Sequence, residues 1–171
     1  MVVYINRHLK DVTMTLAEMN EAKAEIDSAR KRTVDLLARA ERQELDAAWQ
    51  ALDGKPVAQP VRGPETGLVM VRGRMGGGGA PFNLGEVTVT RATIRLASGT
   101  VGHAQALGTD REKARLSAIF DALWQEPATQ AFVEQALLAP IAARLSDADR
   151  RKADETAATR VDFFTMVRGD D

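Results

Sequence analysis

The sequence predicts an α+β domain: N-terminal helices, then a small, mainly antiparallel sheet, then C-terminal helices and an extended arm. Two observations predict this fold class. Apolar residues recur at helical spacing on both sides of a central region, and that region instead carries β-branched residues in alternation. Helices that are segregated from an antiparallel sheet, rather than alternating with its strands, are typical of α+β folds.

Composition narrows the class of protein. The 171 residues suit one domain, and 44% hydrophobic and 27% charged residues are ordinary for a globular chain. A net charge of −1 predicts no general affinity for nucleic acid or an anionic membrane. The chain has no cysteine, which excludes disulfides and thiolate metal sites, and no apolar run near the roughly 20 residues of a membrane span. We expect a cytoplasmic protein.

The N-terminal part divides into a leader and a helical region. Residues 1–27 are interpreted as a leader that is disordered or precedes the native start, and residues 28–171 as a single domain. The spacing predicts a helix over 28–53 with Ser28 as its cap, and two separate apolar faces lie along it.

The centre of the chain is predicted to be β. Residues 66–75, 86–97 and 100–107 are expected to be strands, the last two joined by a two-residue turn, Ser98-Gly99. The predicted cross-strand pairs are Leu96/Val101, Arg95/Gly102, Ile94/His103, Thr93/Ala104, Ala92/Gln105 and Arg91/Ala106. In this register Arg91 and Arg95 face only small residues, so a helix, a partner subunit or an anion must fill the space beside them.

The apolar phase changes within the second of these strands. Val87 and Val89 are odd-numbered, whereas Ala92, Ile94 and Leu96 are even-numbered. Because strand side chains alternate between faces, we expect either a bulge near Thr90-Arg91 or burial of both faces.

Three helices are predicted after the sheet. Thr109 and Glu112 form an expected capping box, and Pro127 suits the first turn of the second helix. Pro140 is expected to interrupt the helical pattern, and Ser146 to cap a last, polar helix that ends near residue 159.

The glycine-rich segment Arg72–Gly79 is the first candidate site. Arg72 and Arg74 precede four consecutive glycines, of which Gly76 and Gly77 are the first two. Glycine backbones can approach a ligand closely, and arginine binds oxyanions such as phosphate or phosphonate. The segment lacks the lysine and Ser/Thr of a P-loop, so the sequence favours a connection that a partner covers over an anion site of this chain.

Arginines on the strands form a second candidate. The region 61–109 holds Arg62, Arg72, Arg74, Arg91 and Arg95 but only Glu65 and Glu86, a net charge of +3 from five cations and two anions. This surface would bind an anionic ligand or an acidic partner, or else form ion pairs with acidic helices at 110–126 and 146–155. His103, expected on an apolar face, is interpreted as a core or interface residue rather than a catalytic base.

The C-terminal arm, residues 160–171, is apolar for a chain end. Its apolar residues are Val161, Phe163, Phe164, Met166 and Val167. Soluble monomers avoid such exposed patches, so docking into another subunit is favoured over burial on the chain's own sheet.

These segments also resemble a known family. Arg74-Met75-Gly76-Gly77, the strand Leu84–Ala92 and the closing stretch Arg160–Asp170 resemble the PhnG family, the G subunits of the bacterial carbon–phosphorus lyase system. The resemblance covers about residues 28–170 and leaves out the leader.

The resemblance implies work inside a complex. Such a subunit assembles with the H, I and J subunits, and functions with the L component, in phosphonate catabolism. The complex transfers a phosphonate, such as methylphosphonate, to C1 of the ribose of ATP and releases adenine, giving ribose 1-phosphonate 5-triphosphate. ATP and phosphonate are then substrates of the complex. No cofactor, metal or catalytic residue is expected on this chain. The alternatives left open are a stand-alone nucleotide- or phosphate-binding enzyme and a purely structural scaffold subunit.

Overall fold

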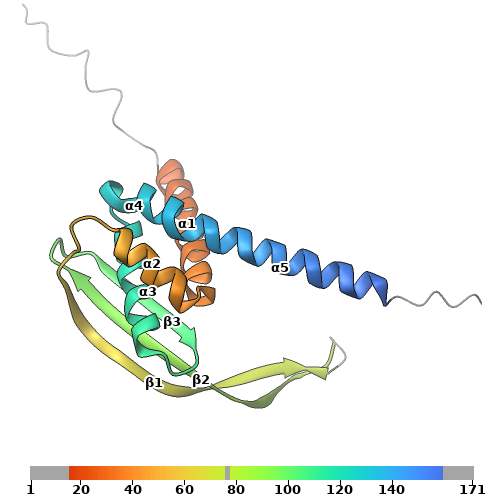
Figure 1. Cartoon of the computed structure of the whole chain (residues 1–171). Coiled ribbons are helices and arrows are strands. Elements are labelled where there is room, and N and C mark those ends of the chain that lie inside the picture. The colour runs from red at the N-terminus through yellow and green to blue at the C-terminus, as the bar shows by residue number, and fades with distance from the viewer. Residues whose placement is uncertain (1–15, 76–77, 160–171) are drawn as a thin grey trace, which may run out of the picture.

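The computed structural model describes residues 16–75 and 78–159. Figure 1 shows helices gathered over one face of a three-stranded sheet, with a two-stranded ribbon and one long helix projecting from this body. The predicted α+β class, with helices before and after an antiparallel sheet, is confirmed. None of the helices in the described part is long and apolar enough to cross a membrane.

Within the described residues before the sheet, 16–57, there are two helices, not one. They are α1 (Leu16–Arg39) and α2 (Arg42–Ala51). Ser28 lies inside α1, so the predicted cap there is wrong and the expected end of the leader is not a helix boundary. The chain breaks at Ala40–Glu41, where Glu41 and Glu44 form a reciprocal capping box that satisfies backbone N–H groups at the start of α2. The break explains why the sequence carries two apolar faces, since each belongs to a different helix.

The sheet has the order β1-β2-β3 and is antiparallel throughout. Its strands are β1 (Ala58–Arg74), β2 (Pro81–Leu96) and β3 (Val101–Leu107). The turn between β2 and β3 has three residues, not two: the Leu96 N–H bonds to the Thr100 carbonyl, and Gly99 has a φ of 95°. A three-residue hairpin loop typically places a glycine at such a left-handed position.

The extra turn residue shifts the predicted register by one. Ile94 pairs with Gly102 and Ala92 with Ala104, and these side chains form the buried face. The pairs on the opposite face are Arg95/Val101, Thr93/His103, Arg91/Gln105 and Val89/Leu107. The predictions that His103 pairs with Ile94 and that both arginines face only small residues are therefore wrong.

The bulge predicted near Thr90-Arg91 is also wrong, because the register of β2 with β3 is continuous there. The irregularities lie in the pairing of β1 with β2, beside Pro60, before Glu65 and after Val71. Proline cannot donate to a ladder, so bulges and an edge position are where a strand tolerates it. The odd-numbered valines of β2 do not need a bulge at residue 90, because they lie on the face away from the core.

Helix α3 (Arg111–Trp124) covers the buried face of the sheet and forms the centre of the core. Asp110, not Thr109, caps it by accepting a hydrogen bond from the Lys113 N–H. Helix and sheet meet most closely at Gly102, where a Cβ atom would lie 2.0 Å from the Ala118 carbonyl oxygen. Only glycine allows this approach of strand to helix.

The C-terminal helices run on without the interruption expected at Pro140. Helix α4 (Pro127–Val133) leads into a π-helical turn (Glu134–Leu138) and then into α5 (Ala139–Ala158). In the π turn the Ala139 N–H bonds to the Glu134 carbonyl, so Pro140 occupies the first turn of α5, where a missing N–H costs little. Ser146 lies within α5 and caps nothing. From Ser146 to the end of α5 every residue is exposed, and Figure 1 shows this half projecting from the body.

Candidate functional site

The glycine-rich segment lies at the tip of a two-stranded ribbon, which the structure describes over residues 68–75 and 78–88. Arg72 pairs with Asn83 and Arg74 with Pro81, and the Gly79 N–H bonds to the Met75 carbonyl to close the turn. Gly76 and Gly77 lie outside the described residues. β3 ends opposite Val89, so among the described residues no third strand pairs with this part of the sheet, and Figure 1 shows it extending away from α1 to α4.

The four candidate arginines do not form one cluster. Arg72 lies opposite Asn83, whereas Arg91 lies opposite Glu65. These positions are seven residues apart along β1 (72 minus 65), about 23 Å at roughly 3.3 Å per residue. Arg95 follows Arg91 along β2 and therefore lies still further from Arg72. A single oxyanion cannot contact the arginines of both ends.

Arg91 is paired within the sheet. Its Nε lies 2.7 Å from Glu65 Oε1, and Arg62 Nε lies 3.4 Å from the same oxygen. The expected pairing of Arg91 with acidic helices at 110–126 or 146–155 is therefore wrong. All three side chains are about half exposed, so the pairs add little stability and reduce the net positive charge available to a ligand.

A groove of about 560 Å³ lies between α1 and this part of the sheet. Its lining is mixed: the polar residues are Asp35 from α1 and Arg62, Arg91, Thr93, His103 and Gln105 from the strands, and the apolar ones are Val34, Ala38, Ala92 and Ala104. His103 is exposed, and its Nδ1 lies 3.1 Å from the Thr93 hydroxyl. Within the described residues no group of three or more His, Cys, Asp or Glu could hold a metal ion.

Asp121, a buried carboxylate that the sequence analysis missed, forms a hydrogen bond at the free edge of β3. Asp121 of α3 is fully buried and accepts hydrogen bonds from Arg30 Nη2 at 2.8 Å and from the His103 N–H at 2.8 Å. The hydrogen bond to Asp121 raises the pKa of Arg30. Gln125 donates to the Val101 carbonyl at 3.0 Å, which satisfies another edge group. The sequence offered one signal for it, because Asp121 is an acidic residue within the apolar run of α3. Such a residue is usually interpreted as lying on the surface.

The hydrogen bonds of this cluster satisfy polar groups at the edge of β3. An edge strand leaves unpaired N–H and C=O groups that invite pairing with other chains. Here Arg30, Asp121 and Gln125 supply partners for the edge at Val101 and His103. All buried side-chain polar atoms in the described ranges have a hydrogen-bond partner, so the core leaves no unpaired group for a substrate.

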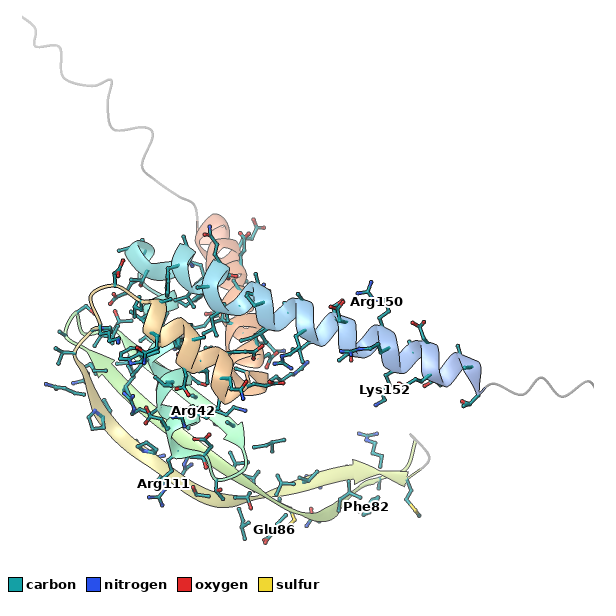
Figure 2. All side chains as sticks on the ribbon, viewed as in Figure 1. Arg42, Phe82, Glu86, Arg111, Arg150 and Lys152 are labelled. Carbon is teal, nitrogen blue, oxygen red and sulfur yellow. The ribbon has the colours of Figure 1, made fainter. Side chains whose placement is uncertain are left out.

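The ribbon exposes many large apolar side chains. Most of the large hydrophobic residues that are exposed lie in it: Leu68, Val69, Met70, Met75, Phe82, Leu84 and Val87. Figure 2 labels Phe82 and Glu86 on the ribbon, well clear of α1 to α4. A two-stranded ribbon is marginally stable by itself in water, and apolar patches of this kind mark interaction surfaces.

Comparison with known proteins points to the same conclusion. The family model for phosphonate metabolism protein PhnG matches residues 28–169. A curated relative from Rhizobium meliloti (strain 1021), named alpha-D-ribose 1-methylphosphonate 5-triphosphate synthase subunit PhnG, is 64% identical over 156 residues. The aligned part covers 90% of this chain and 99% of the relative.

Proposed function

The chain belongs to the PhnG family, and from that premise we propose that it is an accessory subunit of a synthase complex in phosphonate catabolism. The complex transfers a phosphonate such as methylphosphonate to C1 of the ribose of ATP and releases adenine. The support is the near-complete match to a relative named as a subunit of ribose 1-methylphosphonate 5-triphosphate synthase.

One geometric observation carries the assignment to a subunit rather than to a free enzyme. The ribbon exposes its apolar side chains beyond the last residue of β3, where no other described element covers them. Folding normally removes such surface from water, so a surface left in this state fits a chain that completes its burial in an assembly.

The partners we propose are the H, I and J subunits of the carbon–phosphorus lyase core complex, with the L component acting functionally. ATP and the phosphonate bind to the complex, and this chain supplies no cofactor. We also propose a cytoplasmic location for this chain, together with these partners.

A turnover assay tests the proposal. The purified chain with ATP and methylphosphonate is expected to release no adenine, whereas the complete set of subunits releases adenine only when this chain is included. Adenine release by the chain alone would instead favour a stand-alone nucleotide-binding enzyme. If a set of subunits that lacks this chain released adenine at the same rate, the chain would have no accessory role in the reaction.

A second candidate, a scaffold subunit with no ligand contact, is favoured by the distance of about 23 Å between Arg72 and Arg91. Arg74→Ala and Arg91→Ala, each in the assembled complex, separate the two roles. Lost turnover in an intact complex indicates contact with the ligand, and full turnover indicates scaffolding.

The C-terminal arm lies outside the described residues, and its docking role is part of the proposal. A chain that lacks residues 160–171 is expected to stay folded and to stop copurifying with the I subunit. Copurification at the level of the full-length chain would show that the arm is not part of the interface.

A further inference from the structure

We infer that the ribbon, described over residues 68–75 and 78–88, docks with its apolar face in a groove on another subunit, and that the rim of this groove bears carboxylates. The inference rests on the proposed function and adds to it the surface used and the chemistry of the partner. It comes from the bulge in β2, which decides where each ribbon side chain lies.

Before the bulge, the two strands place their valines together. Val69 lies directly opposite Val87, and Val71 follows two residues later on the same face. Leu68 lies opposite Thr88 and Met70 opposite Glu86, on the other face. The face of Val69 is therefore apolar and the opposite face is mixed.

The bulge keeps the apolar face continuous toward the tip. The register passes from Val71/Gly85 to Arg72/Asn83, which leaves Leu84 as an extra residue on β2. The inserted residue changes the phase of the strand, so even-numbered Phe82 joins the odd-numbered valines opposite Gly73. Leu84 lies over Gly73, since a Cβ there would be 2.5 Å from Leu84 Cδ1. The apolar stripe is defined by these residues: Val69, Val71, Phe82, Leu84 and Val87.

The cations of β1 lie on the other face, because β1 has no inserted residue here. Arg72 and Arg74 alternate with Val71 and Gly73 along β1, so both lie on the face away from the apolar stripe. The ribbon carries only one acid, Glu86, and its net charge is +1 from two cations and one anion. An apolar face with basic residues behind it is complementary to an apolar groove whose rim bears Asp or Glu side chains.

A second copy of this chain is a poorer occupant. Two identical ribbons brought together would each contribute the same net positive charge, and like charges disfavour such pairing. We therefore expect the isolated chain to sediment as a monomer and the contact to form only with other subunits of the synthase.

Two leucines make a matched test. Leu84 lies in the stripe and is 61% exposed, and Leu68 lies on the opposite face and is 64% exposed. Leu84→Ser and Leu68→Ser thus remove the same side chain at nearly equal exposure from the two faces of one ribbon. Binding of each full-length variant to the remaining synthase subunits is measured by titration, with thermal unfolding of the free chain as the fold control.

The expected result is a loss of about 10-fold or more in affinity for Leu84→Ser and less than about 3-fold for Leu68→Ser. Phe82→Ser, also in the stripe, is expected to behave like Leu84→Ser, which guards against a local defect at the bulge. The Arg72→Glu, Arg74→Glu double variant is expected to weaken binding and to reverse its salt dependence.

Three outcomes overturn the inference. They are equal losses for the two leucine variants, no loss for Leu84→Ser and Phe82→Ser, and a chain that dimerises through the ribbon by itself. The first two require that the unmodified chain binds the other subunits. If the unmodified chain does not bind, the proposed function fails first, and the two failures are therefore distinguishable.

Discussion

The two halves of β2 have the same neighbour, β1, but very different surroundings. From Thr90 to Leu96 the strand lies between β1 and β3, and its even-numbered side chains are buried under α3. From Pro81 to Val87 it pairs only with β1, and every side chain is exposed. The two halves contain similar proportions of apolar residues, so the third strand and the covering helix, not composition, decide which half becomes core.

The largest expected effect lies in the packed half. Gly102→Ala would place a Cβ 2.0 Å from the Ala118 carbonyl oxygen and 2.7 Å from the Ala122 nitrogen, both backbone atoms of α3. We expect a loss of about 3 kcal/mol or more in the free energy of unfolding, because helix and strand must separate. Urea denaturation followed by circular dichroism measures it.

Gly67→Ala is the control, since a Cβ at this β1 glycine would have no heavy atom within 4 Å. Its unfolding free energy is expected to stay within about 0.5 kcal/mol of the unmodified chain. Similar effects at the two glycines would show that the close approach of α3 is not what distinguishes the halves.

An intermediate effect is expected at the edge of the packed half. Asp121→Asn keeps an oxygen for the His103 N–H but removes the charge that faces Arg30. We expect about 2 kcal/mol of destabilisation, less than for a fully buried pair because the Arg30 side chain is 34% exposed. Asp46→Asn, in the exposed Arg42 pair, is the control and is expected to cost under about 1 kcal/mol. A greater loss at Asp46 would argue against the edge cluster.

The smallest effect concerns pH and the junction of α2 with α5. Burial alone would raise the pKa of Glu44, but hydrogen bonds from Arg144 and from the Glu41 N–H outweigh it and leave this pKa lowered. The folded protein therefore binds this proton less tightly than the unfolded chain. The stabilisation is present above the usual glutamate pKa of about 4.3 and is lost as pH falls through the lower folded value.

Glu44→Gln is accordingly expected to cost about 0.5 to 1 kcal/mol at pH 7. The difference from the unmodified chain should shrink below about pH 4, as measured by thermal unfolding over a pH series. A difference that is constant with pH would mean that Glu44 acts through packing and not through its charge.

The sequence predicted the fold class and the family, but not the register. Ser98-Gly99 fits a two-residue turn and also the end of a three-residue loop, and only the burial of Ile94 against Gly102 selects the second. That one-residue difference placed His103 on the wrong face. Pro60 and Pro64 hid the first part of β1, because a strand pattern cannot show that bulges will accommodate proline.

The candidate site was predicted in outline only. The segment Arg72–Gly79 stays a candidate, but the sequence did not predict its separation from Arg91, which depends on the pairing of β1 with β2. Asp121 was missed because the sequence does not reveal that a strand edge needs an acceptor at that point of α3.

The extra residue at Leu84 means that the length of β2 matters as much as its side chains. Inserting one residue after Val71, opposite Leu84, would restore a continuous register and turn Leu84 and Phe82 away from the face that carries Val69 and Val87, with almost no change in composition. Chains that differ here by one inserted or deleted residue would present different surfaces even if every other residue were identical. The surface that this ribbon presents to a partner thus depends partly on the number of residues in each strand. A comparison of substitutions alone would not reveal this dependence.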